Sequence, residues 1–133
     1  MVFLDPRRDV YWANVRSILN FWKDYSVLDV CCGHGQFADI WPRTKYAGMD
    51  FSEKMIELAK ERSDKQFVCA DIKEVESFPI VDVVFEVNSL RSLGWKPEQF
   101  LEKFKPFAKQ IVACLECDVF TIFYLYDGAR KKR

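Results

Sequence analysis

Cysteine, glycine, proline and histidine are scarce in this chain of 133 residues, which has five, five, five and one of them. An odd number of cysteines, two of them adjacent, argues against a disulfide framework and favours reduced thiols. An excess of one charge is also missing, because 20 Lys and Arg balance 20 Asp and Glu. The net charge of zero argues against a dedicated nucleic-acid binder, which needs cations to neutralise phosphates.

Long apolar runs are absent as well. No run approaches the roughly 18 residues of a membrane-spanning helix, and the first residues lack the basic and apolar pattern of a signal peptide. We therefore expect a soluble, cytoplasmic protein without a membrane partner. Since 50% of the residues are hydrophobic, a chain of this length is expected to bury the core of one domain.

What the chain does have is a short apolar strand that runs directly into glycines. Residues 27–30 (VLDV) suit a strand buried on both faces of a parallel sheet. Gly33 and Gly35 follow, and residues 36–40 can start a helix. Without a Cβ atom, the backbone N–H groups are open to close approach by a ligand. The stretch therefore predicts a cradle for a small molecule.

Two protein families use such a cradle. Gly33-x-Gly35-x-x-Ala38 passes as a loose dinucleotide fingerprint. Asp29 lies four residues before the first glycine, and the order acid, two small residues, Gly-x-Gly resembles motif I of the class I S-adenosylmethionine-dependent methyltransferases. That family usually has a third glycine where this chain has Cys31, which lacks the conformational freedom of glycine at positive φ.

A second acid ends the next predicted strand, residues 46–49. Asp50 lies seventeen residues after Gly33, close to the roughly 20-residue offset of an acid that binds ribose hydroxyls. The segment with Phe51 resembles motif II of the same family. The resemblance implies that Asp50 binds the ribose and that Phe51 lies at the cofactor.

A third acid follows the strand predicted at residues 66–69. Asp71 resembles the motif III acid, which implies that it accepts a hydrogen bond from the adenine amino group while Ile72 covers the ring. Taken alone, Asp71 is an ordinary helix cap. The strength of the resemblance lies in the ordered set of motifs.

The fourth predicted strand, residues 80–85, leads into a loop at 86–90 that faces the transferable methyl group in the family. Glu86 is a candidate for the cofactor pocket, and Asn88 is a weak candidate for orienting a substrate or for forming a turn. The Asn-Pro-Pro-Tyr sequence of some base and amide methyltransferases is missing. His34 is expected to contribute its backbone to the glycine loop more than its ring.

Two amphipathic helices complete the expected elements. Residues 6–23 form one, on which Tyr11 and Trp12 are candidates for a lid over the cofactor. Pro97 starts the other. Its apolar face is predicted to carry Phe100, Leu101, Phe104, Phe107 and Ala108.

The end of the chain departs from the family. A fifth strand at residues 111–115 is followed by 116–118, which suffice only for a tight turn, and by a strand at 119–126. A tight turn requires an antiparallel hairpin, so this is a short form that lacks the usual region between the fifth and last strands. Because both faces of the last strand are apolar, we expect a homodimer or a partner protein at this edge.

Metal binding is not expected. Cys114-x-x-Cys117 is a single cysteine pair, and the one histidine is far away in the sequence. The basic residues 130–133 are expected to form a solvated tail.

These elements predict an α/β fold, a three-layer Rossmann-like sandwich. Its mostly parallel sheet of about six strands has the order 3-2-1-4-5 plus one antiparallel edge strand. Residues 1–133 form a single domain, with an N-terminal helix in 1–24, the core in 25–126 and a basic tail in 127–133.

The resemblance implies a transferase, an S-adenosylmethionine-dependent methyltransferase with an unidentified acceptor. Because the usual substrate-recognition segment is missing, the alternative is a minimal cofactor-binding or regulatory subunit that needs a partner chain. A nicotinamide-dependent dehydrogenase is a poorer interpretation, since it explains Gly33 and Asp50 but leaves Asp29 and Asp71 unassigned.

Overall fold

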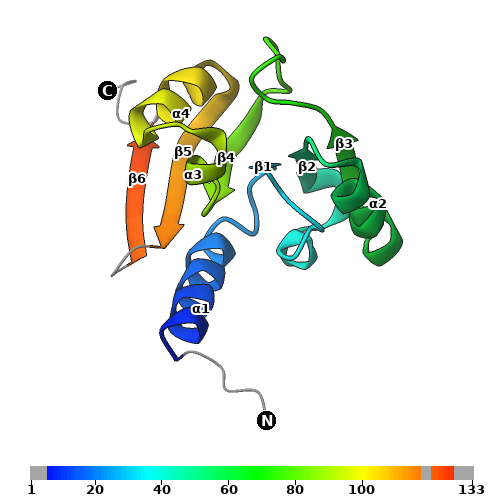
Figure 1. The fold of residues 1–133 in the computed structure, drawn as a ribbon, viewed down its shortest axis with the longest axis horizontal. Coiled ribbons are helices and arrows are strands. Elements are labelled where there is room, and N and C mark those ends of the chain that lie inside the picture. Colours follow the sequence, from blue (N-terminus) through cyan, green and yellow to red (C-terminus); the bar gives the residue numbers. More distant parts are fainter. Residues whose placement is uncertain (1–5, 118–120, 128–133) are drawn as a thin grey trace.

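The strands form one six-stranded sheet in the order β3-β2-β1-β4-β5-β6 (Figure 1). The computed structural model describes residues 6–117 and 121–127, without the side chains of 6–9, 117 and 121–127. The strands are β1 (Val27–Val30), β2 (Tyr46–Asp50), β3 (Gln66–Cys69), β4 (Val81–Val87), β5 (Ala108–Cys117) and β6 (Thr121–Asp127). The first five are parallel and β6 is antiparallel to β5. The predicted strand order and the closing hairpin are confirmed.

The helices cover the two faces of this sheet. They are α1 (Pro6–Asn20), α2 (Glu53–Arg62), α3 (Leu90–Leu93) and α4 (Pro97–Phe104), with short 3₁₀ turns η1 (Ala38–Ile40), η2 (Arg43–Lys45) and η3 (Lys105–Phe107). The apolar side of α1 packs with α2 on one face, and α3 and α4 cover the other. The two apolar clusters sandwich the sheet, as expected for a Rossmann-like fold.

The amphipathic pattern predicted for α1 is present. Tyr11, Val15 and Leu19 are buried on one side of the helix, and the helix ends at Asn20, three residues before the predicted end. The Tyr11 hydroxyl donates to the Leu115 carbonyl at 3.0 Å, which joins α1 to the carboxyl end of β5. Tyr11 is therefore part of the core and its hydroxyl is engaged.

The glycine segment does not lead into an α-helix. Residues 31–45 contain only η1 and η2, and the crossover from β3 to β4, residues 70–80, contains turns and irregular backbone without a helix. The helix expected to start within residues 36–40 is present only as the short 3₁₀ turn η1. Pro42 interrupts the crossover after β1. The crossover from β3 to β4 is shorter than the dozen or more residues that a helical crossover takes.

The ends of several other elements also differ from the prediction. Helix α4 ends at Phe104, and the chain turns through η3 around Pro106, so Phe107 and Ala108 do not lie on a helical face. Glu86 and Glu116 were expected in loops, but both lie within strands, β4 and β5. Two glutamates therefore stand in otherwise apolar strands.

Some expectations fall outside the described residues. They include the last residue of the predicted turn, 118, the first two residues of the predicted last strand, 119–120, the two side-chain faces of that strand and the basic tail at 130–133. In the described part of the chain, no helix is long and apolar enough to cross a membrane.

Candidate functional site

The candidate site lies at the carboxyl ends of the central parallel strands. From β1 the chain adds β2 and β3 on one side of the sheet and then β4 and β5 on the other side. The switch point therefore lies between β1 and β4, and ligands bind at such points in open α/β sheets. Directly after β1, the Cys32 N–H donates to the Met49 carbonyl at 3.0 Å. This bond joins the glycine loop, residues 31–35, to the end of β2.

Asp50 organises this edge through its carboxylate. Its Oδ2 accepts the backbone N–H of Gly33 at 2.9 Å, and its Oδ1 accepts the N–H of Ser52 at 2.9 Å. A carboxylate has about four lone-pair sites, so each oxygen of Asp50 keeps capacity for one further donor. Asp50 is only 9% exposed, so little of the residue is open to solvent.

The backbone of the glycine loop is left-handed at three positions. Gly33 has φ +57° and Gly35 has φ +77°. A Cβ on Gly33 would meet nothing within 4 Å, whereas one on Gly35 would lie 3.0 Å from the Phe67 ring. Gly33 therefore opens onto free space and Gly35 permits close packing. Cys31 has φ +61°, so a cysteine takes the strained conformation for which the family uses glycine.

The third acid lies next to this pair. The Ala70 N–H donates to the Asp50 carbonyl at 3.0 Å, so the backbone before Asp71 runs beside Asp50. The Asp71 Oδ1 accepts the Lys73 N–H at 3.0 Å, and the side chain is exposed. The structure thus brings Gly33, Asp50 and Asp71 to one edge.

The remaining predicted residues divide into exposed and buried positions. Phe51 is 74% exposed beside Asp50, where its ring is available to a ligand. Ile72 is buried among the apolar side chains on the α4 side. His34 contacts the Arg62 guanidinium of α2 through Nδ1. Asn88 has φ +54°, and its N–H donates to the Leu115 carbonyl at 2.8 Å, so it forms a turn after β4.

Asp29 lies inside β1, before the carboxyl edge of the sheet. Its carboxylate is 2% exposed and accepts the Tyr46 hydroxyl at 2.6 Å. Burial raises the pKa of Asp29 to about 7, with a smaller contribution from the charge of Asp50, while the Tyr46 hydrogen bond opposes the shift. The side chain therefore braces β1 against β2, and a proton can reside on it near neutral pH.

Glu86 is a second buried acid, and Glu116 lies beside it. Glu86 is fully buried, and its Oε2 accepts the N–H and the hydroxyl of Ser89, both at 3.2 Å. Glu86 Oε1 and Glu116 Oε2 are buried without another hydrogen-bond donor. Burial, and after it the neighbouring Glu116 carboxyl, raise the pKa of Glu86 to about 9. A proton held between the two carboxyls gives both oxygens the bond they lack.

Sequence reasoning missed Tyr46, Ser89 and Glu116 as partners of the buried acids. The available signal was an acid inside a continuous apolar strand, since a lone carboxylate there requires a partner. It was overlooked because the strands were expected to end before Glu86 and Glu116.

Metal and thiol chemistry find no support at this edge. Among the described residues, no group of three or more His, Cys, Asp and Glu side chains could hold a metal ion. Burial raises the pKa of the Cys31, Cys32 and Cys114 thiols, which keeps them protonated and weakly nucleophilic.

The family model and the curated relatives that match this chain are all methyltransferases. The family described as "Methyltransferase domain" matches residues 27–110. The chain is 37% identical over 117 residues to the malonyl-[acyl-carrier protein] O-methyltransferase of Acetivibrio thermocellus, covering 80% of this chain and 41% of that protein. It is 33% identical over 61 residues to the demethylmenaquinone methyltransferase of Lactococcus lactis, covering 42% and 24%. The chain spans less than half the length of these curated relatives.

Solved structures share the fold. The plantazolicin methyltransferase BpumL in complex with SAH superposes with a TM-score of 0.65 at 23% identity, covering 82% of this chain and 48% of that one. Magnesium protoporphyrin IX methyltransferase from Synechocystis PCC 6803 with bound SAM gives a TM-score of 0.66 at 16% identity, covering 97% and 70%.

The Glu86–Glu116 pair generates a prediction about stability. The pKa of Glu86 is raised from 4.5 to about 9 on folding, so the unfolded chain releases this proton first and the free energy of unfolding falls as pH rises between those values. The loss is up to about 1.4 kcal/mol per pH unit. We expect Glu86→Gln to remove this loss, because a neutral amide can donate to Glu116.

Urea unfolding at pH 7.5 and 8.5 measures the effect, since the raised pKa of Asp29, about 7, lies below this window. The matched control is Glu57→Gln on the exposed side of α2, which should retain the slope of the unsubstituted chain. An equal slope for Glu86→Gln and the unsubstituted chain would show that the carboxyl pair holds no proton.

Proposed function

Because the chain belongs to the methyltransferase domain family, we propose that it binds S-adenosylmethionine at the carboxyl edge of β1 and β2 and transfers its methyl group to an acceptor. The observation that supports this most is the 2.9 Å hydrogen bond between the Gly33 N–H and the Asp50 carboxylate. It places an open backbone and an acid side by side, as an adenosyl ligand requires.

The residues of this edge suit the parts of the cofactor. Gly33, Gly35 and the backbone of His34 receive the methionine part, because Gly33 opens onto free space. Asp50 accepts the ribose hydroxyls with its remaining lone pairs. Asp71 accepts the adenine amino group, and the exposed Phe51 ring covers the base.

The buried acids Asp29 and Glu86 have a structural role in this proposal. Asp29 and Glu86 are 2% and 0% exposed, so we assign them to supporting the ends of β1 and β4 and not to direct contact with the cofactor. Ile72 is likewise buried, and we assign it to packing beneath the backbone that carries Asp71. These roles replace the cofactor contacts expected of Glu86 and Ile72 from sequence. For Asp29 the family resemblance implied either support of the cofactor's amino group or a fixed glycine loop, and we propose a structural role.

Methyl transfer from the sulfonium, the chemistry that the bound cofactor supplies, is an in-line displacement. The protein accelerates it chiefly by aligning the acceptor. A general base is needed only where the acceptor is protonated at the working pH. Glu86, with its pKa raised to about 9, holds its proton at neutral pH and is unsuited to that task. Asn88 remains a candidate for orienting the acceptor.

The acceptor is open. The relatives named for malonyl-[acyl-carrier protein] and demethylmenaquinone use chemically different acceptors and do not select one for this chain. The four described cysteines are free, which favours a reducing compartment such as the cytoplasm.

A cofactor-binding subunit that needs a partner chain is the second candidate. The direct β5–β6 hairpin, with only residues 118–120 between the strands, supports it, because no further element separates them. Methyl transfer that begins only when a second protein is added would favour this candidate over a self-sufficient enzyme.

Asp50 is the residue to test first. We expect Asp50→Ala to weaken binding of S-adenosylhomocysteine at least tenfold, about 1.4 kcal/mol, because the substitution removes the acceptor for the ribose and for the Gly33 N–H. Calorimetric titration measures this affinity, and NAD titrated in parallel should give no heat.

The matched control is Asp64→Ala, since Asp64 is a fully exposed acid before β3. Its affinity should equal that of the unsubstituted chain. Tight binding of NAD in place of S-adenosylhomocysteine would contradict the proposal, as would unchanged affinity in a folded Asp50→Ala variant.

We also propose that β6 pairs with a second chain. In the described part of the structure β6 has a strand neighbour on one side only, β5, and the other edge offers unpaired N–H and C=O groups. Sedimentation equilibrium at micromolar concentration should give twice the 15.7 kDa mass of the chain. A monomeric mass would exclude the homodimer.

A further inference from the structure

A pocket of about 510 Å³ lies on the sheet at the amino ends of the parallel strands. Its lining includes the residues that begin β1, β2, β3 and β4, namely Val27, Tyr46, Gln66 and Val81. Asp50 is the last residue of β2, and the glycine loop follows β1. Neither Asp50 nor the loop lines the pocket, which extends along β2 as far as Met49. The pocket is therefore separate from the candidate cofactor site, and its volume lies in the range of small-molecule sites.

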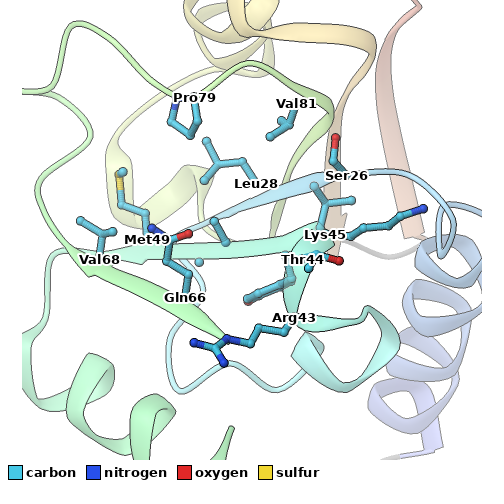
Figure 2. A pocket seen from close by; sticks show the side chains of 14 residues that line it. Ser26, Leu28, Arg43, Thr44, Lys45, Met49, Gln66, Val68, Pro79 and Val81 are labelled. Carbon is cyan, nitrogen blue, oxygen red and sulfur yellow. The ribbon is translucent and has the colours of Figure 1, made fainter. Parts of the chain in front are cut away.

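The pocket exists because the crossover from β3 to β4 contains no helix. Residues 70–80 pass over the sheet as irregular chain, and Val68 of β3 and Pro79 stay exposed there, although Leu28 and Met49 are buried. Figure 2 shows Leu28, Met49, Val68, Pro79 and Val81 around this space. All five side chains are aliphatic, and Val68 is 41% exposed. A ligand with a flexible apolar chain would cover this surface.

The charges at the pocket have one sign. Its lining residues include Arg43 and Lys45 and no Asp or Glu, although the chain as a whole is neutral. In Figure 2 the Arg43 side chain lies in the lower part of the view and extends to the left, whereas Lys45 extends to the right. The Lys45 amine donates to the Asp24 carbonyl at 2.5 Å.

Arg43 is the cation available to a ligand. In the described part of the chain its guanidinium makes no hydrogen bond or ion pair, and its influence on the fully exposed Asp64 is the smallest of those acting on that acid. A guanidinium binds a carboxylate through two parallel hydrogen bonds.

We propose that this pocket binds an aliphatic carboxylate. The chain of the ligand lies on the exposed side chains of Val68 and Pro79, while Leu28 and Met49 line the pocket with little exposed surface. Its carboxylate reaches the Arg43 guanidinium at the edge. This site is independent of the proposed methyl transfer, and it takes its ligand at the amino ends of the strands.

Calorimetry with three probes on the unsubstituted chain tests the apolar contact and the charge contact separately. Octanoate has the chain and the negative charge, octyltrimethylammonium has the chain with a positive charge, and acetate has the charge without the chain. We expect octanoate to bind at least tenfold more tightly than either of the others. Equal binding of octanoate and octyltrimethylammonium, or no binding of octanoate, overturns the proposal.

Two exposed substitutions locate the ligand. Arg43→Gln should weaken octanoate binding about tenfold, because it removes a charge-assisted hydrogen bond to the carboxylate. Val68→Glu should abolish it, because a carboxylate then occupies the apolar surface. Arg91→Gln is the matched control, since Arg91 is an exposed arginine on α3 away from the pocket, and it should bind octanoate normally.

The same variants separate this site from the cofactor site. Arg43→Gln and Val68→Glu should keep the S-adenosylhomocysteine affinity of the unsubstituted chain, which also verifies that they are folded. Octanoate binding that survives both substitutions, or that falls equally in Arg91→Gln, overturns the location. Displacement of octanoate by S-adenosylhomocysteine would show that the two ligands share one site and overturns it as well.

Discussion

The Asp50 carboxylate holds the candidate site together, because it bonds to backbone on both sides of the cradle. It accepts the Gly33 N–H from the loop after β1 and the Ser52 N–H from the start of α2. One charge therefore fixes the loop, the end of β2 and the helix that follows. A buried carboxylate needs such donors. These bonds use one lone pair on each oxygen of Asp50, and the remaining ones are the acceptors that we propose for the cofactor.

The rest of the chain compensates for a short crossover behind the glycine loop. Where a regular helix is usual, only the turns η1 and η2 follow, and α1 packs against this segment in its place. The Arg16 guanidinium donates to the Gln36 carbonyl at 2.9 Å and to the Asp39 carboxylate at 3.0 Å. A neighbouring helix thus holds the exit of the loop. The other short crossover, residues 70–80, has no such substitute and leaves the pocket beside β3.

The sheet could be predicted from sequence because each strand is a compact apolar run ended by polar residues or glycine. Residues 66–69 coincide with β3, and the acids Asp50 and Asp71 meet at one edge as their strand ends require. The partners of the buried acids Asp29 and Glu86 were not predictable in the same way, because they depend on which side chains face one another across the sheet. Glu86 and Glu116, a strand apart in sequence, become partners only when β4 pairs with β5.

Chemical-shift mapping with S-adenosylhomocysteine tests the role of Asp50 most directly. The amide signals of Gly33 and Ser52 report the two hydrogen bonds to its carboxylate. Our account predicts that both shift on titration, while the amides of Gln66 and Val81 at the opposite ends of their strands stay in place. Shifts confined to that opposite edge, or unchanged Gly33 and Ser52 signals at saturation, would contradict it.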